Sequence, residues 1–105
     1  MPKAKTDNGR RKFITAADIT DALTEAGLKR EPDRHEGVCT FHDIDGRVLD
    51  AKEESTGWTF YMYRDIIPDK VVLYRMTWSM LYNNLWPSVI NMVTLCRLNL
   101  NEMKK

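Results

Sequence analysis

The first regular pattern of hydrophobic positions follows a polar stretch of twelve residues at the start of the chain. Apolar residues then recur at helical spacing and would share one face: Ile19, Ala22, Leu23 and Ala26. Thr15 precedes this pattern as an N-cap, with Asp18 three residues later, and Gly27 follows it where a helix commonly ends. The pattern predicts a helix over about 16–26.

Beyond this helix the hydrophobic period changes from helical to alternating. Residues 28–36 are charged and rich in turn formers, which is typical of a linker. Asp45 and Gly46 supply the positive φ angles of a hairpin turn between two alternating segments. The predicted strands are, in order, Val38–His42, Arg47–Lys52, Trp58–Ile66 and Val71–Trp78. Because residues 71–82 could instead begin the last helix, we expect an antiparallel meander of three to four strands.

The last segment has the pattern of an amphipathic helix. About half of its circumference is apolar, through Leu81, Tyr82, Leu85, Trp86, Val89, Ile90, Met92, Val93, Cys96 and Leu100. Pro87 should kink it, because proline lacks an N–H and pushes Trp86 out of the α region. Residues 76–96 carry no charge, but asparagines interrupt them and their apolar positions keep to one side, so we expect no membrane span. The predicted fold is α+β, with an N-terminal helix, an antiparallel meander and a kinked C-terminal helix packed on the sheet.

The charges are distributed unevenly along the chain, although its formal net charge is only +1. Residues 1–12 carry +4 and are predicted to be a flexible basic arm, whereas residues 13–105 would form a single α+β domain. The middle of the chain is acidic, and residues 70–105 again carry +4. No apolar run follows the basic start to make a secretory signal, so we expect a cytoplasmic protein.

Candidate catalytic and metal-binding residues are sparse. His35, Cys39 and His42 lie close in sequence, but their spacing matches no zinc pattern. Cys39 and His42 would also point to opposite faces of a strand, which argues against a nucleophile and its base. We therefore predict no catalytic residue, no metal, no cofactor and no enzymatic activity.

The aromatic residues are concentrated in one part of the chain. Eight of the ten lie between Trp58 and Trp86. Along the third predicted strand, Tyr61 and Tyr63 face one way while Phe60 and Arg64 face the other. If the helices cover a single face, one of these rows is exposed. Tyrosines in such a row could stack on bases or anchor a protein partner, whereas the alternative is that the aromatic residues fill a small core.

The function that we infer from the sequence is non-catalytic protein binding, by a small regulator or inhibitor of a larger complex that handles nucleic acid. Tyr61, Tyr63 and Arg64 would make the contact. Acidic residues around the two hairpin turns would imitate phosphate in a nucleic-acid-binding groove of the partner: Asp43, Asp45, Asp50, Glu53 and Glu54.

Two further hypotheses remain open from the sequence. In the first, the chain binds nucleic acid through the tyrosines and through the basic residues of the arm, which are Lys3, Lys5, Arg10, Arg11 and Lys12. In the second, Leu95 and Leu98 on the otherwise polar side of the last helix form an interface, either in a homodimer or with a larger assembly.

Overall fold

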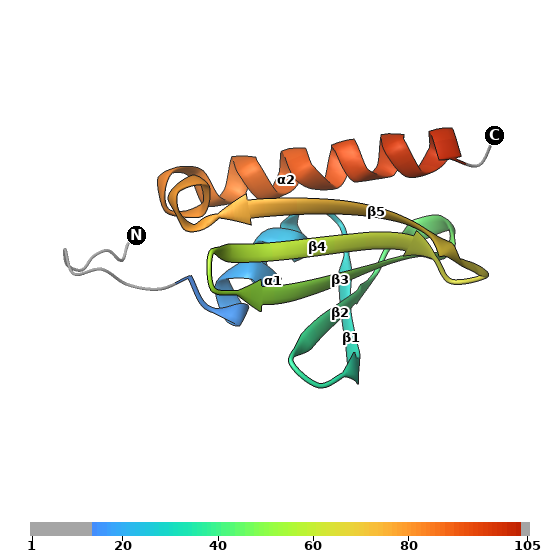
Figure 1. Cartoon of the computed structure of the whole chain (residues 1–105), viewed down its shortest axis with the longest axis horizontal. Coiled ribbons are helices and arrows are strands. Elements are labelled where there is room, and N and C mark those ends of the chain that lie inside the picture. Colours follow the sequence, from blue (N-terminus) through green and yellow to red (C-terminus); the bar gives the residue numbers. More distant parts are fainter. Residues whose placement is uncertain (1–13, 104–105) are drawn as a thin grey trace.

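An antiparallel sheet runs through most of the chain in the computed structural model, which describes residues 14–103 apart from the side chains of residues 67–69 and 103 (Figure 1). The elements in order are α1 (Ala16–Glu25), β1 (Lys29–His35), β2 (Val38–His42), the short 3-10 turn η2 (Ile44–Gly46), β3 (Arg47–Glu54), β4 (Gly57–Arg64), β5 (Ile67–Thr77) and α2 (Trp78–Met103). The strands lie in the order β1-β2-β3-β4-β5, and each is antiparallel to its neighbours. The predicted meander and the α+β class are confirmed.

Helix α1 is defined by the capping chemistry that its sequence predicts. The Thr15 hydroxyl oxygen accepts a hydrogen bond from the Asp18 backbone N–H at 3.2 Å, and the Asp18 carboxylate accepts one from the Thr15 N–H at 2.9 Å. At the other end Gly27 has a φ of 102°, and the Leu28 N–H donates to the Leu23 carbonyl at 3.1 Å. This pattern ends a helix through a glycine in the left-handed region.

Strand β1 lies in the segment that the sequence analysis assigned to a linker, and that assignment is wrong. Its backbone pairs with β2, with Lys29 opposite His42 and Arg30 opposite Phe41. Nearly every side chain of β1 is exposed, so the strand shows no alternation of buried and exposed residues. A strand held at the sheet edge by backbone hydrogen bonds leaves little hydrophobic signal in its sequence. The fifth strand raises the count above the predicted three to four.

The ambiguity at residues 71–78 is resolved in favour of a strand, because β5 runs from Ile67 to Thr77 and α2 begins at Trp78. The predicted kink in α2 is present, but its position was wrong by two residues. The distorted residue is Asn84, with φ −160° and ψ 61°, rather than Trp86. The Pro87 ring clashes with the carbonyl four residues earlier, so the distortion falls on the turn that precedes it.

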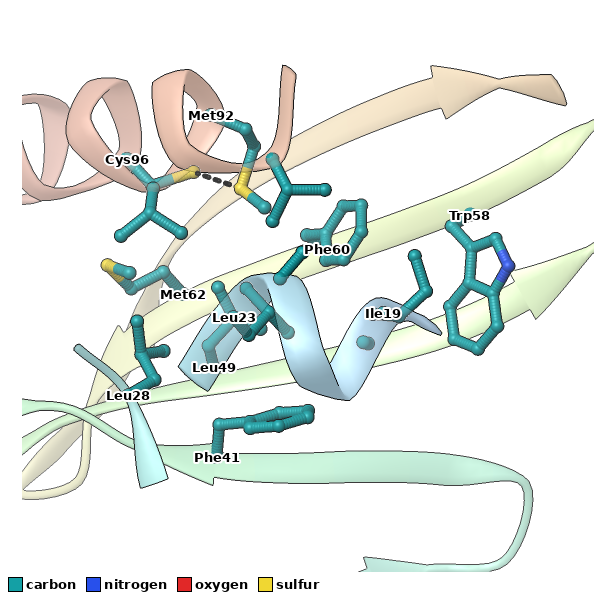
Figure 2. Close-up of a cluster of buried hydrophobic side chains, with 14 of the residues drawn as sticks. Ile19, Leu23, Leu28, Phe41, Leu49, Trp58, Phe60, Met62, Met92 and Cys96 are labelled. Carbon is teal, nitrogen blue, oxygen red and sulfur yellow. Dashed lines mark hydrogen bonds between the residues drawn. The ribbon is translucent and has the colours of Figure 1, made fainter. Parts of the chain in front are cut away.

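Both helices pack on the same face of the sheet. Phe60 and Met62 of β4 are buried under them, together with Leu49 of β3. Figure 2 shows the side chains of α1 and α2 meeting these strands: Ile19, Leu23, Met92 and Cys96. The opposite face, here called the open face, has no helix over it among the described residues. In that same part of the chain, no helix has the length and apolar character needed to cross a membrane.

The turn between β3 and β4 requires glycine at position 57. Gly57 has a φ of 154°, and a Cβ atom at this residue would overlap the backbone carbonyl oxygen of Met76 on β5. We therefore expect Gly57→Ala to lower the free energy of unfolding by about 3 kcal/mol in urea denaturation, through clash and backbone strain. Gly37→Ala is the matched control, because Gly37 also has a positive φ but no atom within 4 Å of the place that an added Cβ would take. Gly37→Ala should lower the free energy of unfolding by about 1 kcal/mol. Equal decreases for the two variants would contradict a clash at residue 57.

Candidate functional site

The open face carries a row of aromatic and aliphatic side chains across β4 and β5. In the strand register Tyr61 lies opposite Leu73, and Tyr63 lies opposite Val71. Val71 is 40% exposed and Leu73 is 47% exposed, while both tyrosines are half-buried. We call these four residues the β4–β5 strip. The sequence prediction that Tyr61 and Tyr63 share a face opposite Phe60 is confirmed.

A buried carboxylate fixes Tyr63 in place. One oxygen of Asp50 accepts a hydrogen bond from the Tyr63 hydroxyl at 3.0 Å, and the other accepts one from the Thr40 hydroxyl, also at 3.0 Å. Asp50 is only 9% exposed. Burial and the hydrogen bond to Asp50 raise the pKa of Tyr63 to about 12. The phenol therefore stays protonated at neutral pH, and its ring is held in one orientation.

An ion pair closes one side of the open face. Arg34 of β1 donates to both carboxylate oxygens of Asp65, in the β4–β5 turn, at 2.9 and 3.3 Å. Arg34 also approaches Glu31 at 3.4 Å. Strands β2 and β3 separate β1 from β4, so the sheet must coil for this contact to form. Figure 1 shows the β1–β2 hairpin turned away from the direction of β4 and β5.

This coiling agrees with the burial of small residues on a face that no described helix covers. Thr40, Val48 and Thr59 are all buried there. Thr59 lies between Lys52 of β3 and Arg75 of β5 in the register, and both of these cations are exposed. The open face therefore combines a hydrophobic strip with a positively charged end.

Asp43 has a different role from the tyrosines. Its carboxylate is buried between Arg47, with Nε at 3.0 Å, and Arg97 of α2, with Nε and Nη2 both at 2.8 Å. Arg97 also donates to the Ala26 carbonyl at the end of α1, at 3.2 Å. Burial alone would raise the pKa of Asp43, but the hydrogen bonds from Arg97 and Arg47 outweigh it and hold the pKa below its usual range. Asp43 thus joins the β2–β3 turn to both helices.

The remaining predicted contact residues do not gather around the tyrosines. Arg64 donates to the Asp45 carbonyl at 2.8 Å and to the Asn101 side chain of α2 at 2.9 Å. Asp45 itself has a side chain that is 72% exposed, and Glu53 and Glu54 lie at the other end of β3. Of the eight residues predicted to bind a partner, the open face brings together Asp50, Tyr61 and Tyr63. The alternative set in the basic arm, residues 3–12, lies outside the described residues.

Val71 and Leu73 were missing from the sequence-based set. Alternation along β5 would have placed them on one face, with Val72 on the other, but only once that segment was known to be a strand paired with β4. Arg34 and Asp65 left no local signal, because they meet only through the coiling of the sheet.

The residues considered for metal binding or nucleophilic chemistry are separated. Cys39 packs against the core, whereas His42 lies on the open face with Nδ1 3.6 Å from a Glu31 carboxylate oxygen. Burial raises the pKa of Cys96 to about 11, so its thiol is a weak nucleophile. Within residues 14–103 no three His, Cys, Asp or Glu side chains come together as metal ligands would.

Comparison with known proteins adds no functional information. No protein-family model matches the sequence, and no match is found among the curated proteins or among the solved structures. The function of this chain must therefore be argued from the geometry of its own residues.

The Asp43 contacts predict how stability depends on pH. Because the folded-state pKa of Asp43 is depressed, its contribution is complete above the usual value of 3.8 and is lost as the pH falls through the folded-state pKa. Asp43→Asn should lower the free energy of unfolding by about 3 kcal/mol at neutral pH and flatten its decline below pH 3.8. Urea denaturation across pH measures both effects. Asp45→Asn removes an exposed carboxylate two residues away and should change little; a loss as large as that of Asp43→Asn would contradict this role.

The hydrogen bond between Tyr63 and Asp50 predicts that Tyr63 ionises at an unusually high pH. Tyr63 should ionise near pH 12, instead of at its usual pKa of 10.0, in an ultraviolet absorbance titration. Because the folded-state pKa is raised, the stability linked to Tyr63 is complete below pH 10.0 and is lost as the pH rises towards 12. Tyr63→Phe should remove the ionisation step near pH 12. A late step that persists in this variant would show that the assignment is wrong.

Proposed function

We propose that this chain is a non-catalytic protein-binding module that contacts its partner through the open face of the sheet. The observation that supports this proposal is the β4–β5 strip, in which Tyr61 and the hydrogen-bonded Tyr63 lie beside the exposed Val71 and Leu73. Tyrosine anchors next to aliphatic side chains are typical of the centre of protein interfaces. In this proposal the module acts as a small regulator or inhibitor of a larger complex.

The fixed position of Tyr63 favours binding for an entropic reason. A side chain that is already ordered loses less freedom on association, so more of its contact energy remains as affinity. The same fixed phenol argues against catalysis, because a tyrosine with a pKa of about 12 neither gives up nor accepts a proton readily near neutral pH. The free thiols Cys39 and Cys96 suit a reducing compartment, in line with a proposed cytoplasmic location.

The chemistry of the open face indicates what the partner would present. An apolar surface would cover the β4–β5 strip, and a carboxylate would suit the exposed cations Lys52 and Arg75 at its end. Asp43 and Asp50 are engaged in internal hydrogen bonds. An acidic contact that imitates phosphate would therefore depend on Asp45, Glu53 and Glu54. These three residues are the reason for proposing a partner that handles nucleic acid.

The test is affinity capture with the full chain from the lysate of its own cells, in nuclease-treated and untreated halves. We expect a protein partner that survives nuclease treatment, and Tyr61→Ala should weaken its binding by at least about tenfold, as interface tyrosines do. Tyr82→Ala is the matched control, because Tyr82 is an exposed tyrosine on α2. Its binding should equal that of the unmodified chain.

Two outcomes would overturn this proposal. Loss of all captured proteins on nuclease treatment would favour the nucleic-acid hypothesis. Equal weakening by Tyr61→Ala and Tyr82→Ala would place the contact somewhere other than the open face.

A further inference from the structure

The β4–β5 strip is followed along the open face by two cations that have no partner among the described residues. Lys52 and Arg75 lie on either side of Thr59 in the strand register, and both are exposed. Within residues 14–103 neither cation makes a hydrogen bond or an ion pair, whereas the other five described arginines all donate to a carboxylate or a carbonyl oxygen. The open face therefore presents two apolar rows and then a pair of free positive charges.

The outer side of α2 carries the complementary pattern. Leu95 is 37% exposed and Leu98 is 57% exposed, and the exposed Glu102 follows one turn later. At positions i, i+3 and i+7 these three residues share one side of the helix, while Cys96 and Leu100 are buried on the side that faces the sheet. Figure 1 shows α2 as the outermost layer on its side of the sheet. Two leucines and a carboxylate thus point away from the molecule.

We propose that α2 of a second copy of this chain docks with its outer side on the open face. Its two leucines would cover the β4–β5 strip, and Glu102 would lie between Lys52 and Arg75. Because side chains on one face of a strand repeat every two residues, Arg75 lies about 13 Å along β5 from Val71. Leu95 and Glu102 are two helical turns, or about 10 Å, apart. The long side chains of arginine, lysine and glutamate span the difference.

The open face favours a helix over an extended segment as its occupant. Strand β4 has neighbours on both sides, so its backbone groups are paired within the sheet. An extended segment on this face would press its own unpaired N–H and C=O groups against apolar side chains, whereas a helix satisfies these groups internally. The diameter of a helix, about 10 Å, also matches the width from β3 to β5, which is two strand spacings of about 4.8 Å.

Charge complementarity sets the direction of the docked helix. If α2 runs parallel to β5, Glu102 meets Lys52 and Arg75. In the reverse direction Glu102 would lie beyond Val71 and approach Asp65, whose side chain is 52% exposed, and two carboxylates repel one another. One chain carries both halves of this contact, so a second copy supplies what the open face requires.

The contact joins two different surfaces, which lie on opposite sides of the molecule. The copy that receives α2 on its open face still has its own α2 uncovered, so a third copy can add in the same way. The inference builds on the proposed function, because it takes the open face as a contact surface. Self-association would cover the β4–β5 strip until the partner protein displaces the second copy.

The experiment is sedimentation of the full chain at concentrations up to about 1 mM, which reaches weak contacts. We expect the average mass to rise with concentration beyond that of two chains. Leu98→Asn on α2 and Arg75→Glu on the open face should each raise the dissociation constant by at least about tenfold. An equimolar mixture of these two variants should form pairs and nothing larger, because one variant keeps an intact α2 and the other keeps an intact open face. Circular dichroism of each variant shows that the fold is retained.

Two matched controls change the same kinds of residue elsewhere. Met80→Asn replaces an apolar residue that is 39% exposed at the start of α2, and Lys29→Glu reverses an exposed cation of β1. Both should leave the association unchanged. A monomer at every concentration of the unmodified chain would overturn the inference. It would also be overturned if the mixture of Leu98→Asn and Arg75→Glu stayed monomeric, or if either control weakened the association as much as its counterpart.

Failure of this inference can be distinguished from failure of the proposed function. Leu98→Asn leaves the open face unchanged, so this variant should capture the same partner protein as the unmodified chain. A chain that stays monomeric but captures a partner through Tyr61 overturns only the self-association. A chain that associates through Leu98 and Arg75 but captures no partner overturns only the proposed function.

Discussion

The constraint on which the rest of the structure depends is that α1 and α2 lie on the same face of the sheet. The large apolar side chains of the strands that pack against the helices must therefore point to that face, as Phe60 and Met62 do. The opposite face has to satisfy its polar groups from within the sheet. The Asp50 carboxylate accepts hydrogen bonds from two hydroxyls, and Arg34 reaches Asp65 across two intervening strands. These contacts order the open face, although no element within residues 14–103 covers it.

Local chemistry explains why some elements could be predicted from the sequence. The capping box at Thr15 and the glycine at position 27 define α1 within one residue of the expected bounds, and alternation along β4 correctly separated the tyrosines from Phe60. Strand β1 could not be predicted in this way, because backbone pairing with β2 holds it and its side chains bury little. The kink at Asn84 could not be predicted exactly either. Its position depends on which residue of the preceding turn distorts to relieve the clash with Pro87, and sequence spacing alone does not determine that residue.

The candidate site was predicted only in part for a similar reason. Tyr61 and Tyr63 follow from strand period, which is a local property. The acidic residues looked alike in the sequence, yet they separate in the fold according to partners that are distant along the chain. Asp43 meets Arg97, which is 54 positions away, and becomes a joint between the helices and the β2–β3 turn. Asp45, two residues on, lies 3.7 Å from Arg47 but keeps a side chain that is 72% exposed. Burial of a charge is decided by such long-range contacts, which no local pattern records.

The charged strand β1 has a consequence for the size of any assembly built on this sheet. A sheet with two receptive edges can add copies without end and grow into a fibre. In this chain the lysine, arginines, acidic residues, histidine and proline of β1 oppose that growth at one edge. One protected edge is enough to stop such growth, because a fibre uses both edges of every sheet that it contains.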